Sequence, residues 1–196
     1  RKCIRTGHIL SMKEEIDMVY TAQYPSPLGM ITLASDGQNL TGLWLEGQKY
    51  FASTLKGKMP LQEEPPVLQA AKRWLDRYFA GEKPKIDDLP LAPEGSRFQQ
   101  EVWKLLCEIP YGSVTTYGEL ARKIAAIQKR PSMSPQAVGS AVGRNPISII
   151  IPCHRVVGTS GSLTGYAGGI GKKIQLLERE GVDTSRFTIP TKGTAL

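Results

Sequence analysis

Cys153, His154 and Arg155 stand next to one another, directly after an apolar segment, 147–151, that Pro152 closes. A cysteine attacks an electrophile only as the thiolate, and the pKa of a free thiol is about 8.5. An imidazole or a guanidinium beside the thiol lowers that pKa or carries the proton away. The tripeptide therefore indicates nucleophilic chemistry at Cys153. The alternative is a buried structural cysteine, because buried free cysteines are common in proteins.

The apolar segment before Cys153 lies between two prolines, Pro146 and Pro152. It is long enough for one buried strand and too short for a helix. We therefore expect a strand that ends where the reactive side chains begin.

The sequence on either side of this segment extends the pattern. Asn145 and Pro146 precede it, Pro152-Cys153-His154-Arg155-Val156 follows it, and Gly165-Tyr166-Ala167-Gly168-Gly169 comes shortly afterwards. This long and specific pattern resembles the O6-alkylguanine-DNA alkyltransferase family, the methylated-DNA–protein-cysteine methyltransferases. The resemblance covers about residues 20–181. It implies DNA repair by direct, stoichiometric and irreversible transfer of the alkyl group from O6-alkylguanine in double-stranded DNA to Cys153, and leaves open whether O4-alkylthymine is a second substrate.

The resemblance also implies roles for individual residues. His154 is the general base, linked to Cys153 through water, and Glu180 orients His154. The alkyl carbon is buried in the duplex, so the nucleotide must be flipped out. The residues implied to bind the extruded guanine are Asn145, Ser148, Val156 and Tyr166. The residues implied to contact the DNA are Tyr117, Gln136, Ala137 and Thr159.

Gln136 departs from the family pattern, because relatives usually carry an arginine there that fills the gap left by the flipped base. Glutamine can fill space and form hydrogen bonds, but it carries no charge. We therefore expect retained activity with weaker or slower flipping.

Charge is distributed unevenly along the chain. Residues 1–96 contain 12 Lys and Arg and 12 Asp and Glu, a net charge of zero, whereas residues 97–196 contain 13 and 6. The net charge of +7 therefore lies in the half that carries Cys153. A basic half favours a polyanionic partner such as DNA; a basic surface that only confers solubility is the alternative.

The cysteines indicate neither a disulfide framework nor a zinc site, because Cys3, Cys107 and Cys153 are odd in number and far apart, without a CxxC motif. The expected chemistry requires no metal and no cofactor. No apolar run approaches the roughly 18 residues of a membrane span, and 1–11 lacks the apolar region of a signal peptide. We expect a monomer in the cytoplasm, or in the nucleus of a eukaryote.

Alternating apolar residues predict three antiparallel strands at 20–24, 30–34 and 40–45. Residues 47–66 are polar and are expected to form a loop with some helix. Apolar residues at helical spacing predict a helix over 67–79 that ends at Gly81. Residues 82–95 contain three prolines and are expected to link two domains.

The second half is expected to be mainly helical. Ser96 with Gln99, and Thr116 with Glu119, form capping-box patterns that predict helix starts. The second of these helices spans 117–127, and Ser134 with Pro135 predicts a third after a short connection. This spacing is typical of a helix-turn-helix. A last helix is expected over 171–180, where Glu180 opposes the helix dipole and therefore requires another role.

The third helix contains several small residues, including Gly139 and Gly143. Glycine inside a helix costs about 1 kcal/mol relative to alanine. Either close helix packing or close approach to DNA would explain it. The resemblance favours the second explanation, because relatives lay this helix in the minor groove, whose degenerate code suits action at any sequence.

The expected fold class is α+β, with a small antiparallel-sheet domain, ribonuclease H-like by resemblance, and a mainly helical domain with a helix-turn-helix. The expected organisation is an N-terminal tail over 1–19, an α/β domain over 20–90, an alkyltransferase and DNA-binding domain over 91–182, and a tail over 183–196. Three alternative functions stay open: a non-catalytic binder of alkylated DNA, a Cys-His hydrolase of acyl groups, and a helix-turn-helix regulator.

Overall fold

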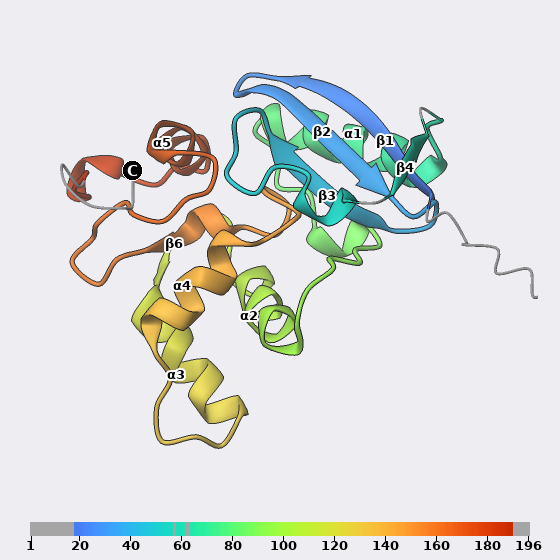
Figure 1. Cartoon of the computed structure of the whole chain (residues 1–196). Coiled ribbons are helices and arrows are strands. Elements are labelled where there is room, and N and C mark those ends of the chain that lie inside the picture. Colours follow the sequence, from blue (N-terminus) through green and yellow to red (C-terminus); the bar gives the residue numbers. More distant parts are fainter. Residues whose placement is uncertain (1–17, 57, 62, 190–196) are drawn as a thin grey trace, which may run out of the picture.

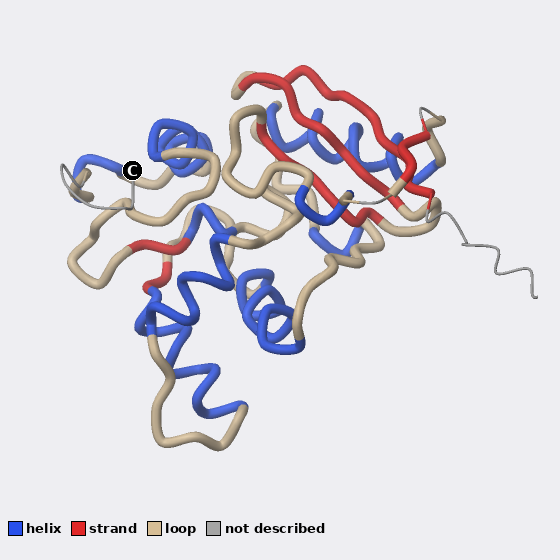
Figure 2. Tube along the Cα trace, viewed as in Figure 1, coloured by secondary structure: helices blue, strands red, loops and turns tan. Residues whose placement is uncertain are grey.

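The computed structural model of the chain describes residues 18–56, 58–61 and 63–189. Most of the two expected tails, including Cys3, lies outside these residues. A sheet with one helix against it forms one end of the molecule, and a cluster of helices forms the other (Figures 1 and 2). The expected α+β fold class is confirmed.

Four strands form the N-terminal sheet in the order β3-β2-β1-β4. Their bounds are β1 Met18–Ser26, β2 Gly29–Ser35, β3 Leu40–Leu45 and β4 Met59–Leu61. The three antiparallel strands are confirmed, but β4 pairs parallel with β1. The sequence analysis did not predict β4, which makes the sheet mixed, because three residues at an exposed edge leave no alternating pattern to detect.

The two faces of the sheet have different partners. Helix α1, Pro66–Phe79, lies against one face (Figure 1), where Leu43 and Leu45 of β3 enter the main core. Trp44 points to the other face and packs with Val19, Ala34 and Leu55. Leu55 belongs to a short 3-10 helix, η1, Ser53–Leu55, within the segment expected to be a loop with some helix.

In the described part of the C-terminal half there are four α-helices. Their bounds are α2 Arg97–Cys107, α3 Tyr117–Ile127, α4 Pro135–Gly143 and α5 Ile170–Arg179. The shorter elements are η2 Ile86–Asp88, β5 Thr115–Thr116, η3 Cys153–Arg155, β6 Val156–Val157 and η4 Thr184–Arg186. Both predicted capping boxes are present, and Ser134 accepts a hydrogen bond from the Ala137 amide at the start of α4. Helices α3 and α4 form the expected helix-turn-helix.

The segment 147–151 is not the strand that we expected. Only Ile147 forms a bridge to the sheet, parallel to Leu43 of β3, and the chain then turns. Ile149 has a φ of 69°, a left-handed conformation that is strained for a β-branched residue. The prediction failed because hydrogen bonds from the nearby Asn145 side chain and from the backbone of Leu43 in β3, which periodicity does not encode, bend the apolar run into a buried turn.

The edge of β3 joins the two halves. Leu40 pairs with Leu91 of the linker, and the amide of Leu43 donates to Pro146 while its carbonyl accepts from Ser148. One apolar core extends from the sheet and α1 through α2, α3 and α4 to the Cys153 segment. The sheet therefore fixes the position of the turn before Cys153.

Residues 182–189, which we expected to belong mostly to a tail, pack against the C-terminal half. Val182 and Phe187 pack with Leu163 and Leu177, and Thr188 pairs with Ser162. The prediction missed this contact because the apolar residues here are too widely spaced to indicate an element.

The Ser96 cap gives a test of the fold. Ser96 Oγ accepts from the Gln99 amide at 3.3 Å. We expect Ser96→Ala to lower the free energy of unfolding by about 1 kcal/mol in urea titrations, because an amide of the first turn loses its acceptor. Ser96→Asp retains an acceptor and should cost much less. Equal midpoints for all three proteins would contradict this role.

Candidate active site

Asn145 organises the buried turn that leads to Cys153. Its side-chain oxygen accepts from the Ile147 amide at 3.0 Å, and its Nδ2 donates to the Ile151 carbonyl at 2.8 Å. The same Nδ2 lies 3.2 Å from Cys153 Sγ. One buried amide therefore both bends the chain and contacts the sulfur.

Cys153 is buried at the start of η3. Burial raises the pKa of its thiol, and the Asn145 hydrogen bond and the positive charge of Lys173 oppose this only in part. We had expected the Arg155 guanidinium to lower this pKa as well. That expectation was wrong, because Arg155 turns away from the sulfur and donates to Glu180 and to the Ile109 carbonyl.

His154 is fully buried and its two ring nitrogens differ. Nε2 lies 2.7 Å from Glu180 Oε1, whereas Nδ1 has no hydrogen-bond partner within the described protein. A carboxylate accepts only, so Nε2 carries the proton and Nδ1 presents a lone pair. Burial lowers the pKa of His154, with the Glu180 carboxylate opposing this shift. The imidazole is therefore neutral at pH 7 and can accept a proton at Nδ1.

The Glu180 carboxylate, at the C-terminal end of α5, accepts hydrogen bonds from several parts of the chain. Oε2 accepts from Arg155 Nε at 2.7 Å and from the Gly112 amide at 3.2 Å. Oε1 accepts from His154, Arg155 and Tyr78. Burial raises the pKa of Glu180, but the hydrogen bonds and charges of His154 and Arg155 outweigh it and hold the pKa at about 2.

The close approach of the Gly112 backbone to Glu180 requires a glycine at position 112. It has a φ of 73°, and a Cβ there would lie 2.8 Å from the Glu180 carbonyl oxygen. Any other residue would push Glu180 away from His154.

Lys173 on α5 is a buried cation beside the site. Its Nζ donates to the carbonyls of Val156, at 2.5 Å, and Thr164, at 2.8 Å. Burial lowers the pKa of Lys173 to about 8, and the charge of Cys153 opposes this shift. The lysine therefore connects β6 to the loop before Tyr166 and supplies positive charge near the sulfur.

The residues implied to bind guanine surround the same region. Val156 follows η3 in β6, and Tyr166 contacts the His154 ring edge-on, with centroids 6.5 Å apart. The Tyr166 hydroxyl is buried and forms no well-aligned hydrogen bond with the described residues, although it lies near the Ser148 hydroxyl, which opposes the effect of burial on its pKa. Ser148 is also buried, and its hydroxyl donates to Gln48 Oε1 at 3.1 Å, so the N-terminal half contributes to this wall.

A groove runs between the helix-turn-helix and the loop after β6. Three residues implied to contact DNA line it, namely Tyr117, Gln136 and Thr159. Ala137 is exposed next to Gln136 at the start of α4. Tyr117 closes the inner end, where its hydroxyl donates to the Thr164 carbonyl at 3.1 Å.

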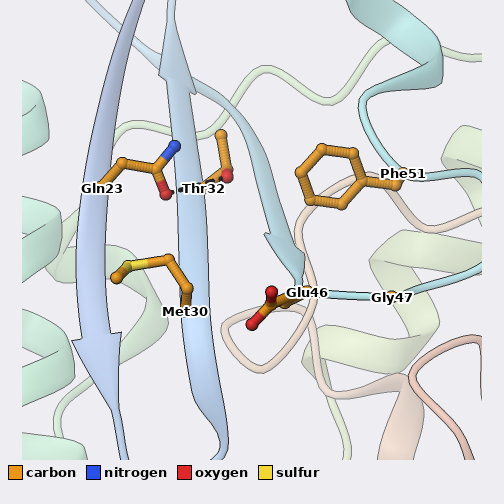
Figure 3. Close-up of a pocket in the computed structure, with 6 residues that line it drawn as sticks. All are labelled: Gln23, Met30, Thr32, Glu46, Gly47 and Phe51. Atoms are coloured by element: carbon orange, nitrogen blue, oxygen red, sulfur yellow. Dashed lines mark hydrogen bonds between the residues drawn. The ribbon is translucent and has the colours of Figure 1, made fainter.

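A separate pocket lies on the outer face of the sheet (Figure 3). Met30 and Phe51 form its apolar part, Thr32 donates a hydrogen bond to Gln23, and Glu46 provides its charged group. It holds no cysteine or histidine and none of the implied site residues. This pocket is not part of the Cys153 site.

No cluster of three or more His, Cys, Asp or Glu side chains suited to a metal ion occurs among residues 18–56, 58–61 and 63–189. Within the same ranges, no helix has the length and apolar character needed to cross a membrane.

Sequence reasoning missed four residues of this site. They are Gln48, Tyr78, Arg155 as a partner of Glu180, and Lys173. Lys173 had a signal, because it lies three residues after Ile170 and three before Leu176, on the apolar side of α5. Tyr78 belonged to an aromatic stripe that was correctly predicted as core, and nothing local distinguished its hydroxyl.

Two family profiles match this chain. The profile described as the 6-O-methylguanine DNA methyltransferase ribonuclease-like domain matches residues 19–93, and the DNA binding domain of the same family matches residues 97–182. A methylated-DNA–protein-cysteine methyltransferase of Haemophilus influenzae is 44% identical over 162 residues, covering 83% of this chain and 86% of the relative. The corresponding protein of Methanosarcina acetivorans is 46% identical over 169 residues, covering 83% and 99%.

Solved structures show the same similarity. The crystal structure of Mycobacterium tuberculosis OGT in complex with DNA has a TM-score of 0.69 and 43% identity, covering 87% of this chain and 94% of that one. The O6-methylguanine-DNA methyltransferase of Pyrococcus kodakaraensis has a TM-score of 0.57 and 26% identity, covering 84% and 100%.

The Glu180 network predicts an acid-sensitive stability. A carboxylate with a lowered folded pKa contributes stability that is complete above its unfolded pKa, 4.5, and is lost as the pH falls through the folded value, about 2. We expect the free energy of unfolding to fall across this window and Glu180→Gln to reduce that fall. At pH 7 the variant should be less stable by roughly 3 kcal/mol, because Arg155 stays buried without its counter-charge.

Glu178→Gln is the matched control, because Glu178 is exposed on the same turn. It should unfold like the parent protein in urea at pH 7 and at pH 3. An identical acid dependence in Glu180→Gln would show that the carboxylate is not held as described.

Proposed function

Because this chain belongs to the 6-O-methylguanine DNA methyltransferase family, we propose that Cys153 is the residue that accepts the alkyl group. The activity is transfer of an alkyl group from O6-alkylguanine in DNA to a cysteine of the protein itself, which repairs the DNA directly. The sulfur attacks the alkyl carbon, the carbon–O6 bond breaks, and the electron pair goes to O6 of the restored guanine. The product is a thioether, so each molecule reacts once.

This proposal depends on His154 Nδ1, which has no hydrogen-bond partner in the part of the chain that the structure describes. The resting thiol is protonated, since burial raises the pKa of Cys153, and it needs a base at the moment of attack. A neutral imidazole with a free Nδ1, held at Nε2 by Glu180, is such a base. A water molecule between Nδ1 and the sulfur would pass the proton, which gives His154 and Glu180 the roles that the family resemblance implied.

The walls around Cys153 suit an extruded guanine. Burial, followed by the charges of Cys153 and Glu180, raises the pKa of Tyr166, so its hydroxyl stays protonated. A buried donor that the described residues leave without a well-aligned acceptor is costly unless a ligand satisfies it. We assign the Tyr166 hydroxyl to the leaving base, where it donates as negative charge develops, and Asn145, Ser148 and Val156 to the shape of the pocket.

The groove along α4 is the proposed DNA contact, with the duplex bound through its minor groove. A Cβ on Gly139 would meet the Tyr117 ring at an ordinary 3.6 Å, and one on Gly143 would meet nothing within 4 Å. Internal packing therefore does not require these glycines, and close approach of a DNA backbone explains them. Tyr117 and Thr159 line the groove toward Cys153, and Gln136 and Ala137 project from the start of α4.

A non-catalytic damage binder does not fit this site, because the nucleophile and its base are both present. The hydrolase and the regulator likewise have no support from the relatives, which carry methyltransferase names over most of the chain. We propose that the protein acts as a monomer, with one groove serving one lesion.

Mass spectrometry of the protein after incubation with duplex DNA containing O6-methylguanine tests the function. We expect Cys153 to gain the mass of one methylene group in a 1:1 ratio, with no turnover. Cys153→Ala should gain nothing. Cys107→Ala should react normally, because Cys107 lies on α2, outside the buried turn in which Asn145 contacts the sulfur of Cys153. A released product with many turnovers per molecule would favour a hydrolase.

Gln136→Arg tests the departure from the family. Gln136 is exposed and its Oε1 accepts only a local hydrogen bond from Ser134, at 2.9 Å. We expect the arginine to accelerate single-turnover repair by roughly tenfold, about 1.4 kcal/mol, because a cation in the stack supports the flipped state. Gln38→Arg, in an exposed turn of the sheet, adds the same charge and should not accelerate repair. Unchanged DNA affinity and repair rate in Gln136→Arg would refute this role.

A further inference from the structure

Both halves of the chain hold the Glu180 carboxylate. Oε1 accepts from His154 Nε2 at 2.7 Å, from Arg155 Nη2 at 3.0 Å and from the Tyr78 hydroxyl at 2.9 Å. His154 and Arg155 belong to η3, but Tyr78 belongs to α1 and lies 102 positions before Glu180. The contact therefore reaches from the N-terminal half into the catalytic network.

The Tyr78 ring is fixed from three sides. It stacks on Trp74 with centroids 5.5 Å apart, and it meets Phe79 and Tyr111 edge-on at 5.4 and 6.2 Å. Only 1% of Tyr78 is exposed, so its hydroxyl cannot turn to solvent. Burial, followed by the charge of Glu180, raises the pKa of Tyr78, and the phenol remains a donor.

This donor affects His154 through a shared atom. A neutral hydroxyl on Oε1 takes up part of the negative charge that otherwise acts on the imidazole proton. The other titratable or charged groups that face His154 or Glu180 are Cys153, Arg155, Lys173, Tyr111 and Tyr166. Removal of the Tyr78 hydroxyl leaves all of these side chains in the protein, so the substitution tests the hydroxyl itself.

We propose that Tyr78 is a positioning residue for alkyl transfer, and that its hydroxyl sets the place and the charge of the Glu180 carboxylate that acts on His154. The N-terminal half thereby contributes a functional group to the reaction as well as a scaffold. This inference rests on the roles proposed above for Cys153, His154 and Glu180.

Tyr78→Phe tests the proposal, because it keeps the ring and deletes the donor. More negative charge on Oε1 stabilises the protonated imidazole and raises the pKa of His154. The single-turnover rate on O6-methylguanine duplex falls as His154 becomes protonated, so the midpoint of this fall should move to a higher pH by roughly half a unit. At one acidic pH this is about a threefold slower reaction, with little change at the alkaline plateau.

Tyr24→Phe is the matched control. The Tyr24 hydroxyl donates to Asp76 Oδ1 at 2.8 Å, so this variant also loses one tyrosine hydrogen bond to an acid on α1, away from Glu180. It should lose less stability than Tyr78→Phe, because the Tyr24 bond is only part-buried, and it should keep the parent pH profile. A purely structural role for Tyr78 predicts the same unshifted profile in both variants, and that result would overturn the proposal.

Histidine NMR separates this inference from the proposed function. The chain has two histidines, His8 and His154, so a His8→Gln background leaves one imidazole to titrate. Tyr78→Phe should raise the His154 pKa in this background and Tyr24→Phe should not, whether or not DNA is repaired. If the parent protein transfers no methyl group to Cys153, the assignment of Cys153 is refuted instead.

Discussion

A buried carboxylate must be matched by donors and counter-charge, or its desolvation destabilises the fold. Glu180 imposes this requirement on the whole molecule. Its donors come from α1, from the loop after α2, and from η3, while the carboxylate itself ends α5. These segments are far apart in the sequence, and the carboxylate is satisfied only when all of them meet.

The same requirement separates the roles of two neighbouring residues. Arg155 neutralises Glu180 and fixes its plane with two hydrogen bonds, at 2.7 and 3.0 Å. His154 then shares Oε1 without becoming protonated, because burial and the nearby cations lower its pKa. The sequence suggested that both His154 and Arg155 activate the thiol. In the structure Arg155 instead stabilises the Glu180 carboxylate, and only His154 is placed to accept a proton.

Helix caps and periodic patterns were predictable from the sequence, whereas hydrogen bonds that follow no periodic pattern were not. The capping boxes at Ser96 and Thr116 depend on side chains three residues apart, and both were found. The placement of Glu180 against the helix dipole predicted another role for this residue, and the structure places its carboxylate in a buried hydrogen-bond network. The turn over 147–151 was missed, because Asn145 and Leu43 form it through hydrogen bonds that leave no periodic signal. The Tyr78 hydroxyl was missed for the same reason.

The pairing of the turn with β3 has a consequence for self-association. Unpaired strand edges recruit other chains, and proteins protect them by covering them or keeping them short. Linker residue Leu91 and turn residue Ile147 cover β3, and the opposite edge strand, β4, spans three residues and includes Pro60. The segment that carries the nucleophile therefore also shields the sheet, and a change that loosens it would leave β3 open to aggregation.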